Sequence, residues 1–386
     1  MCSVGIFEKD GKMKKLLFVI HTLGGGGAEK VLVNLVNNLP REKYEITVAS
    51  VFDEGVNKKF LKSDIEYLFL FKKAFRGNRV FFKSLSPRFV YKKLVGNRKF
   101  DVVISYLEGI SARIVSGCAD KHAKKVCWIH CELNDFSYSN CFKNKKEADE
   151  IYASYDRIVC VSKEIADTFC SISGLYEKTV CLYNVNETDR IVEKSKEKCS
   201  EKYLSDNTAK ICFIGKITEN KGVLRLLKAH ELFFEKNIPH RFILLGTGSL
   251  RGKIEKELCL KGIEKDFVFA GYQTNPYKII SRCDIFALPS YFEGFSTAAT
   301  EALILEKPCI VTECCGMSEL FGKNNEYGIV AKSEEEFYAL LEKLVTDRQL
   351  RNYYSKKAKE RSAAFTAKKI LEAHEKFFEK LTEENR

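Results

Sequence analysis

The feature that most constrains the fold of this chain is the alternation of short apolar segments with helix-length segments. In the first half of the chain, the apolar segments cover residues 15–20, 45–52, 101–107, 124–130, 157–162 and 178–183. They are short, rich in β-branched residues and apolar along their whole length, which is typical of strands buried on both faces of a parallel sheet. The alternation therefore predicts a doubly wound α/β domain.

The alternation stops near residue 184 and then begins again. Residues 185–208 are polar, and we expect them to form a linker. Further strands are predicted at 210–216, 240–246, 266–271, 283–290, 308–313 and 327–332. With 386 residues the chain is long for a single core. We expect a polar leader over 1–13, a first Rossmann-like domain over 14–184 and a second over 209–364.

Two doubly wound domains place the carboxyl ends of two parallel sheets across one cleft. Ligands bind in such open sheets at the switch points of strand order. This arrangement suits an enzyme that joins two substrates, with one held by each domain.

Composition indicates a globular protein of the cytoplasm. The chain is 45% hydrophobic and 30% charged, and no apolar run approaches the roughly 20 residues that span a bilayer. Its fifteen cysteines include no CxxC pair, the number is odd, and the first residues are too polar for a signal peptide. We expect reduced thiols, almost all of them small buried residues.

The net charge of +12 is concentrated in one stretch. No acidic residue occurs between Glu66 and Asp101, where the basic residues are Lys72, Lys73, Arg76, Arg79, Lys83, Arg88, Lys92, Lys93, Arg98 and Lys99. Aromatic residues are interleaved with them. Nucleic acid, an anionic bilayer and a solvated face over core aromatics are the alternatives. We favour the bilayer and expect no nucleic-acid partner.

Four glycines, residues 24–27, precede the first predicted helix. A dinucleotide fingerprint needs a third glycine, and Glu29 or Lys30 occupies that position. The loop therefore does not indicate a dinucleotide site.

The segment 287–313 carries the strongest chemical pattern. A predicted strand ends near Ser290, a turn contains Glu293 and Gly294, and a helix begins near Ser296 or Thr297 with Glu301 about one turn in. Glu293 is then expected to project toward the cleft, and the helix N-terminus to favour an anion. Gly294 would let the backbone approach a ligand closely.

Three further side chains follow predicted strands. Lys216 and Lys221 come after the first strand of the second domain, where two cations suit a diphosphate leaving group. His130 ends a strand of the first domain and is expected to face the same cleft.

With these motifs, the chain resembles the retaining, nucleotide-sugar-dependent glycosyltransferases of the GT-B fold, in the large family 4 group. "GGGGAEK" is similar to that group's G-G-A-E loop, "CDIFALPSYFEGFSTAATEAL" to its E-x7-E signature, and "GTGSLRGKIE" and "GYQTNPYKII" to two further stretches. The resemblance covers nearly the whole chain. It implies that the C-terminal helix, 365–386, packs back on the first domain.

The resemblance implies a role for each matching residue. Lys216 and Lys221 would bind the diphosphate beside Gly215, and Glu293 would contact the hydroxyls of the transferred sugar. Phe295 and Ser296 would supply backbone amides near it. Glu301 would bind the ribose hydroxyls.

Three more positions of the donor site follow from the same likeness. The loop of Tyr272 would hold the base, and Gly26 and Gly27 would approach the donor phosphate or the acceptor. His130 would sit beside the sugar and the reacting bond. One departure concerns Lys216, which stands where the family usually has Arg and lacks the bidentate fork of a guanidinium.

The expected reaction moves a sugar from a UDP- or GDP-sugar to a hydroxyl with retention of configuration. No D-x-D triplet occurs, so no metal and no cofactor are expected. The family likeness implies a saccharide acceptor, linked to a lipid such as undecaprenyl diphosphate, used in surface polysaccharide synthesis at the inner face of the cytoplasmic membrane. A UDP-sugar 2-epimerase on the same fold and a non-catalytic nucleotide-sugar binder are the alternatives.

Overall fold

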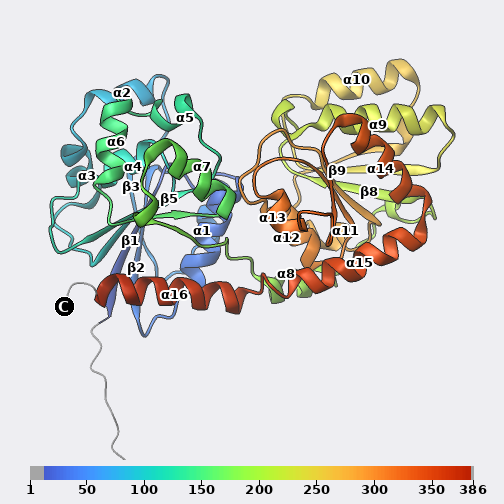
Figure 1. The fold of residues 1–386 in the computed structure, drawn as a ribbon. Helices are drawn as coiled ribbons and strands as arrows, with labels where there is room; N and C mark the ends of the chain where they lie inside the picture. Colours follow the sequence, from blue (N-terminus) through green and yellow to red (C-terminus); the bar gives the residue numbers. More distant parts are fainter. Residues whose placement is uncertain (1–12, 384–386) are drawn as a thin grey trace, which may run out of the picture.

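The computed structural model describes residues 13–383, which form two α/β domains side by side (Figure 1). The expected leader lies, apart from Met13, outside these residues. One sheet has seven strands and the other six, and every pairing between neighbouring strands is parallel. The predicted pair of doubly wound parallel sheets is confirmed.

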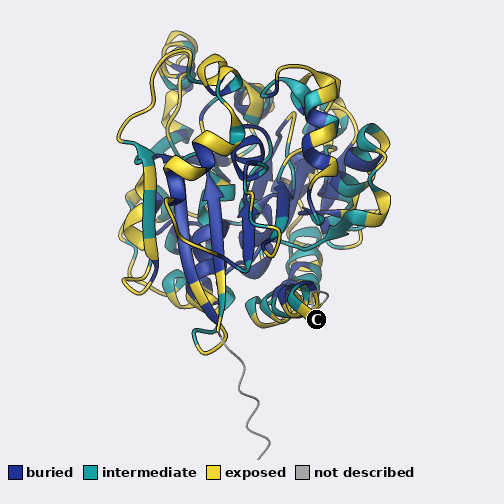
Figure 2. Cartoon of the chain, turned by 90° about the vertical axis from the view of Figure 1, so that its left-hand side faces the viewer, coloured by how far each residue is buried: buried dark blue, intermediate teal, exposed yellow. Residues whose placement is uncertain are grey.

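The N-terminal domain places its most deeply buried strands at the centre of its sheet (Figure 2). In sheet order its strands are β3 (Glu66–Phe71), β2 (Tyr44–Phe52), β1 (Lys14–Ile20), β4 (Val102–Ser105), β5 (Lys124–Ile129), β6 (Arg157–Cys160) and β7 (Thr179–Cys181). Its helices are α1 (Gly27–Asn38), α2 (Asn78–Ser84), α3 (Pro87–Val95), α4 (Ile110–Val115), α5 (Asp135–Ser139), α6 (Lys145–Ala153) and α7 (Lys163–Ser173).

Strand β3 was not among the strands expected from the apolar segments. It lies at the edge of the sheet, where none of its residues is fully buried. Its sequence is nonetheless apolar from Tyr67 to Phe71, but it adjoins the basic residues and was not recognised as a strand. The basic, aromatic stretch begins with this strand and continues into α2 and α3.

The C-terminal domain repeats the same plan. In sheet order its strands are β10 (Phe267–Gly271), β9 (His240–Leu245), β8 (Ala209–Ile214), β11 (Ile285–Leu288), β12 (Cys309–Thr312) and β13 (Ile329–Ala331). Its helices are α9 (Val223–Glu235), α10 (Arg251–Lys261), α11 (Tyr277–Ile280), α12 (Thr297–Ile304), α13 (Met317–Phe321), α14 (Glu334–Thr346) and α15 (Arg348–Ser362).

Each sheet reverses its strand order at its first strand in the chain. Strand β1 pairs with β2 on one side and β4 on the other, and β8 pairs with β9 and β11. A crevice opens at such a reversal, outside the carboxyl ends of the strands. The glycine loop follows β1 and Gly215 follows β8, so both lie at a reversal point.

The segment expected to be a linker contains a helix, α8 (Thr188–Ser195), which packs against α11 and α12. Ile191 is buried, and the Asn275 side chain donates to the carbonyl of Lys194. One buried side chain among charged neighbours gives too little apolar signal to predict a packed helix from sequence.

Helix α16 (Ala367–Glu383) crosses from the C-terminal domain to lie against the N-terminal sheet (Figure 1). Phe378 meets the rings of Phe18 and Tyr44, with centroids 6.2 and 6.0 Å away. The His374 ring stacks on Trp128. The last helix therefore ties the two domains together by apolar contact.

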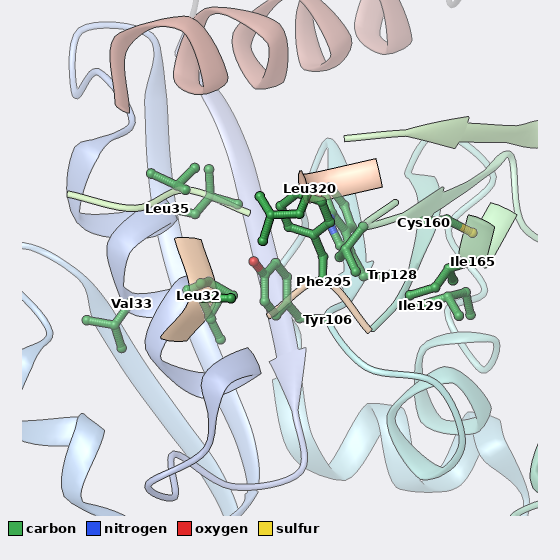
Figure 3. Close-up of a cluster of buried hydrophobic side chains, with 14 of the residues drawn as sticks. Leu32, Val33, Leu35, Tyr106, Trp128, Ile129, Cys160, Ile165, Phe295 and Leu320 are labelled. Atoms are coloured by element: carbon green, nitrogen blue, oxygen red, sulfur yellow. The ribbon is translucent and has the colours of Figure 1, made fainter. Parts of the chain in front are cut away.

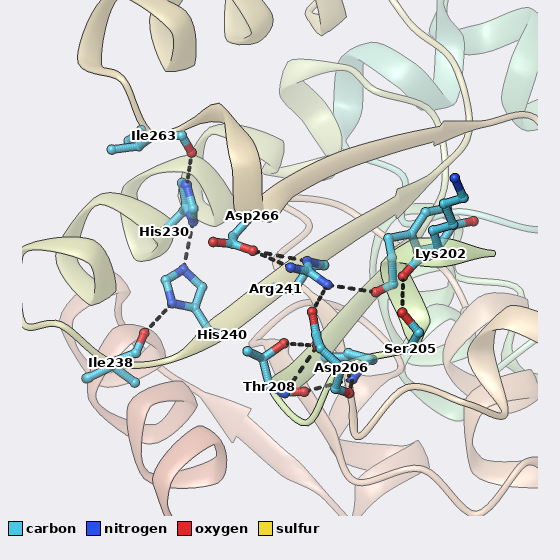
Figure 4. A network of polar contacts seen from close by, with 12 residues as sticks. Lys202, Ser205, Asp206, Thr208, His230, Ile238, His240, Arg241, Ile263 and Asp266 are labelled. Carbon is cyan, nitrogen blue, oxygen red and sulfur yellow. Dashed lines mark hydrogen bonds and ion pairs between the residues drawn. The ribbon is translucent and has the colours of Figure 1, made fainter.

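A polar network fastens the start of β9 (Figure 4). Arg241 forms ion pairs with Asp206, at the end of the linker, and with Asp266, just before β10. The rings of His230 and His240 lie 2.7 Å apart at Nδ1 and Nε2, and each also contacts a backbone carbonyl. These contacts hold together the amino ends of β9 and β10, at the opposite end of the strands from the cleft.

Candidate active site

A cavity of about 780 Å³ lies between the two domains. Its walls come from the loops after β1, β5, β8, β9, β10 and β11, together with α1, α8 and α12. The structure brings every expected donor-site and catalytic residue to this cavity: Gly26, Gly27, His130, Gly215, Lys216, Lys221, Tyr272, Glu293, Gly294, Phe295, Ser296 and Glu301. The motif residues of both domains therefore line the same cavity.

Glu293 projects from the loop after β11 and is held in place by two donors. Lys221 Nζ lies 2.6 Å from Glu293 Oε1, and the Ser290 hydroxyl donates to the same oxygen over 2.7 Å. Only 10% of the Glu293 side chain is exposed. This fixes the orientation of its carboxylate before any ligand arrives.

The second lysine expected to bind diphosphate is arranged differently. Lys216 follows β8 directly and is exposed in the cavity wall, whereas Lys221 ends a 3₁₀ turn, η4 (Glu219–Lys221), and is already paired. A diphosphate would therefore meet an exposed ammonium group at Lys216 and one shared with Glu293 at Lys221.

Helix α12 begins directly after the Glu293 loop. Ser296 is its N-cap and accepts a hydrogen bond from the backbone N–H of Ala299, while Phe295 is buried among Tyr183 and Phe365. Figure 3 shows Phe295 within a cluster of buried side chains that includes Trp128 of the N-terminal domain. Packing and capping together fix the helix N-terminus, whose dipole favours negative charge, at the cavity.

Gly294 lies directly against the backbone of the other domain. A Cβ atom added at Gly294 would come within 1.9 Å of the His130 carbonyl oxygen. At Gly27 the added atom would be 3.2 Å from Thr297 Oγ1, so the glycine loop also faces the start of α12. The two domains approach each other at these glycines because neither carries a side chain.

His130 presents an unpaired nitrogen. Its backbone N–H donates to Glu108, and its ring lies 4.8 Å from that of Tyr106. Within residues 13–383, His130 Nε2 is buried without a hydrogen-bond partner. Burial lowers the pKa of His130 to about 3, so the ring is neutral at ordinary pH. A buried polar atom without a partner at a cavity wall is a candidate ligand contact.

Glu301, on α12, is 2% exposed and does not stand alone. Lys30 Nζ, from α1 of the other domain, lies 2.5 Å from Glu301 Oε1, and the Tyr277 hydroxyl lies 3.3 Å from the same oxygen. Tyr272, expected to contact the base, is 55% exposed at the cavity rim.

Several cavity residues were not expected as site residues: Lys30, Tyr277, Asn184, Arg190 and Lys194. Arg190 and Lys194 belong to α8 and were hidden by the linker interpretation. Lys30 entered the sequence analysis only as a residue that breaks the dinucleotide fingerprint. Its place one residue after the G-G-A-E loop, within the first turn of a helix, was the available signal.

The basic stretch forms a separate surface on the N-terminal domain, away from the cavity lining. Lys72, Lys73 and Arg76 lie between β3 and α2, Arg79 and Lys83 on α2, and Arg88, Lys92 and Lys93 on α3. All eight except the partly buried Lys83 are exposed.

Apolar side chains are exposed among these cations. Val80 is 71% exposed, Phe89 53% and Phe81 39%, whereas Phe82 and Tyr91 are buried. The aromatics of this stretch therefore divide between core and surface.

Two further findings concern residues 13–383. No group of three or more His, Cys, Asp or Glu side chains is arranged to hold a metal ion. No helix in this part of the chain is both long and apolar enough to cross a membrane.

Comparison with known proteins matches each half of the chain to a glycosyltransferase family model. Residues 25–190 match the model of Glycosyltransferase Family 4, and residues 195–361 match that of Glycosyl transferases group 1. A Campylobacter jejuni relative, N-acetylgalactosamine-N,N'-diacetylbacillosaminyl-diphospho-undecaprenol 4-alpha-N-acetylgalactosaminyltransferase, is 26% identical over 93% of this chain and 97% of its own length. The capsular polysaccharide biosynthesis glycosyltransferase CapM of Staphylococcus aureus is 27% identical over 40% of this chain and 42% of its own length.

Solved structures share the whole architecture. HepE from Anabaena, crystallised with UDP and glucose, superposes with a TM-score of 0.75 at 17% identity, covering 95% of this chain and 100% of its own. TarM from S. aureus, in a mutant complex with UDP, gives a TM-score of 0.70 at 15% identity, covering 96% of this chain and 100% of its own. At such identity the likeness concerns the fold. Since the two family models together cover both domains, in the order that the fold requires, the chain belongs to the group 1 and family 4 glycosyltransferases and has the GT-B fold.

Proposed function

We propose that this chain is a retaining glycosyltransferase that moves a sugar from a UDP- or GDP-sugar to a hydroxyl of a lipid-linked saccharide during surface polysaccharide synthesis. The observation that carries the proposal is the meeting, in one interdomain cavity, of the Lys221–Glu293 pair, the α12 N-terminus and the unpaired His130 Nε2. The C. jejuni relative, whose name specifies a diphospho-undecaprenol acceptor, supports the lipid-linked substrate.

The leaving diphosphate is stabilised from the C-terminal domain. Negative charge grows on it as the glycosidic bond breaks, and preorganised positive groups lower the energy of that state. Lys216, Lys221 and the N-terminus of α12 supply this charge at the cavity wall. The proposed reaction therefore uses no metal ion and no cofactor.

Glu293 and His130 act on the sugar. Glu293 Oε1 is occupied by Lys221 and Ser290, so the carboxylate is held fixed while it accepts hydrogen bonds from sugar hydroxyls. The neutral His130 ring offers its unpaired Nε2 to a hydroxyl beside the reacting bond. Among the described residues, the other two glutamates that line the cavity, Glu187 and Glu301, are paired with Arg190 and Lys30, and the proposed reaction uses neither as the second carboxylate of a retaining glycosidase.

Retention then follows from same-face attack. The acceptor hydroxyl forms its bond to the anomeric carbon on the face that the diphosphate leaves, and the departing phosphate oxygen takes the hydroxyl proton. Closure of the two domains excludes water from this step.

The basic surface on β3, α2 and α3 is proposed to rest on the inner face of the cytoplasmic membrane, where a lipid-linked acceptor is presented. Lysine and arginine near an anionic surface contribute about 1 kcal/mol each, and exposed Val80, Phe81 and Phe89 can enter the headgroup layer. The buried Arg113 donates to the carbonyls of Phe82 and Leu85, which holds α2 rigidly beneath this surface.

The reaction is tested by incubating the protein with a panel of UDP- and GDP-sugars, with and without a lipid-linked saccharide, and measuring free nucleoside diphosphate. A transferase releases the diphosphate in proportion to glycosylated acceptor. An epimerase alters the sugar without acceptor, and a binder shifts the melting temperature without turnover; either result contradicts the proposal.

Membrane binding is tested by sedimentation with anionic and neutral vesicles. We expect anionic vesicles to retain more protein, and an Arg76→Gln/Arg79→Gln variant to lose most of the difference. A matched variant with Lys253→Gln/Lys256→Gln, on α10 of the other domain, should behave like the parent protein. Equal retention by both vesicle types would overturn this part of the proposal.

A further inference from the structure

Lys30 reaches from the N-terminal domain into the half of the cavity that belongs to the C-terminal domain. It lies on α1, and its Nζ is 2.5 Å from Glu301 Oε1 and 2.8 Å from the Tyr277 hydroxyl. The Lys30 side chain is 35% exposed, whereas that of Glu301 is 2% exposed. This ion pair therefore joins the two domains inside the cavity and not at its outer surface.

This contact compensates the burial of the Glu301 carboxylate. An ionised carboxylate that is almost fully buried is unfavourable unless a partner of opposite charge and hydrogen-bond donors compensate it. Burial alone would lower the pKa of Lys30, but the nearby Glu301 carboxylate raises it, so Lys30 stays charged. Burial also raises the pKa of Tyr277 to about 12, which keeps its hydroxyl a donor.

The same arrangement occurs around the other carboxylate of the E-x7-E pair. Glu293 Oε1 is contacted by a lysine and a hydroxyl, Lys221 and Ser290, just as Glu301 Oε1 is contacted by Lys30 and Tyr277. Within residues 13–383, the side-chain hydrogen bonds of both glutamates reach Oε1. Each carboxylate is thereby oriented with its second oxygen, Oε2, left to accept from a ligand. The difference is that Lys221 lies in the same domain as its glutamate and Lys30 does not.

We propose that Lys30 is a positioning residue of the donor site. It holds the Glu301 carboxylate in a fixed orientation from across the cleft, so that Oε2 accepts hydrogen bonds from the ribose hydroxyls of the donor. This inference rests on the proposed function and adds a residue to it. Hydrogen bonds from the ribose hydroxyls need a correctly oriented carboxylate, so loss of Lys30 weakens ribose recognition specifically.

The cross-domain origin of Lys30 has a second consequence. The ion pair forms only when α1 and α12 are close, so the state that binds ribose well is the closed state. By linkage, a donor that favours the oriented carboxylate favours closure to the same extent. Two further cross-domain contacts, in which the Gly316 N–H donates to Glu164 and the Lys163 N–H donates to Glu319, lie outside the cavity lining. They therefore hold the domains together without contacting the donor.

The test measures nucleotide affinity by titration calorimetry with UDP and GDP, and continues with the tighter of the two and its 2′,3′-dideoxy analogue. We expect Lys30→Met to weaken the ribonucleotide about tenfold and the dideoxy analogue little. Lys30→Arg should keep most of the affinity. As a matched control, Lys43→Met removes another lysine of the same domain that pairs with two glutamates on α16, and should change neither affinity.

Glu301→Gln provides a second route if Lys30→Met does not fold. It should produce the same selective loss, and combining it with Lys30→Met should weaken binding no further, since both changes remove one interaction. Equal weakening of the ribose and dideoxy nucleotides by Lys30→Met, or no weakening, would overturn the role of Lys30 while leaving the proposed function intact. Failure of the unmodified protein to bind either nucleotide would overturn the proposed function, and this inference with it.

Discussion

The two walls of the cavity are lined by different kinds of residues. The C-terminal wall presents charged side chains at fixed spacing, Lys216, Lys221, Glu293 and Glu301. The N-terminal wall presents glycine backbone and the neutral ring of His130, with Lys30 as the cation that crosses the cleft. The comparison indicates that the C-terminal wall holds a charged donor, whereas the N-terminal wall shapes and closes the site. Three predictions test this division, and a fourth concerns the stability of the N-terminal side.

The largest effect is expected on the C-terminal wall. Replacing Glu293 by Gln keeps its size but removes the charge that Lys221 and Ser290 orient. We expect kcat to fall by about 10²–10³, the range found when an electrostatic group of an active site is removed. Steady-state kinetics with the best donor of the panel checks this. Turnover equal to that of the parent protein would show that Glu293 has no role in the reaction.

Gly294 tests whether the walls must touch. In Gly294→Ala the new methyl group would overlap the His130 carbonyl oxygen, which is backbone and cannot rotate away. The domains must then move apart, and a misplacement of about 1 Å costs about 10²-fold in rate. Gly252→Ala, where an added Cβ meets nothing within 4 Å, is the matched control and should keep full activity. Equal kcat/KM values for the two variants would show that contact at Gly294 is unnecessary.

Variants of Lys216 test which groups bind the diphosphate. Lys216→Met should weaken UDP binding about tenfold, because a charge-assisted hydrogen bond of roughly 1.5–3 kcal/mol is lost. Lys216→Arg should bind at least as tightly as the parent protein, since the guanidinium adds a bidentate fork. Calorimetric titration measures both. If Lys216→Met binds UDP unchanged, Lys221 and the helix N-terminus carry the diphosphate alone.

The smallest effect concerns pH and the N-terminal side. Burial lowers the pKa of His374, on the helix that packs against Trp128, to about 4 from an unfolded value of 6.5. Between these two pKa values the unfolded chain binds more protons than the folded chain. The contribution of His374 to the free energy of unfolding is therefore largest above pH 6.5 and is lost as the pH falls toward 4. His374→Leu should lose less melting temperature than the parent protein between pH 7.5 and 5. An identical pH dependence for both proteins would contradict this.

Much of the fold and the C-terminal wall could be predicted because their signals are local. Central strands such as β1 and β8 are apolar along their length, and the spacing of Glu293 and Glu301 places both next to a helix N-terminus. Strand β3 and helix α8 escaped prediction although each has a local pattern. The apolar residues of β3 adjoin the basic stretch, and α8 buries only Ile191 within a polar segment that was expected to be a linker.

The N-terminal wall could be predicted only in outline. The glycine loop and His130 were expected at the cleft from their positions after strands, but nothing local indicates that Gly294 lies against the His130 carbonyl. The partner of Lys30 lies 271 residues away in the chain. Such contacts depend on how two separately folded domains dock.

The sequence by itself determined two parallel sheets, a cleft at their reversal points and four of the charged residues that line it, Lys216, Lys221, Glu293 and Glu301. Strand, helix and turn patterns depend on neighbouring residues, so they can be recognised from the sequence. Only the tertiary structure decided which charges pair. It placed Lys30 against Glu301, left His130 Nε2 without a partner within residues 13–383 and laid α16 across the N-terminal sheet. The reason is physical: an ion pair or an apolar contact forms between surfaces that folding brings within a few ångströms, and the order of residues along the chain does not encode that distance.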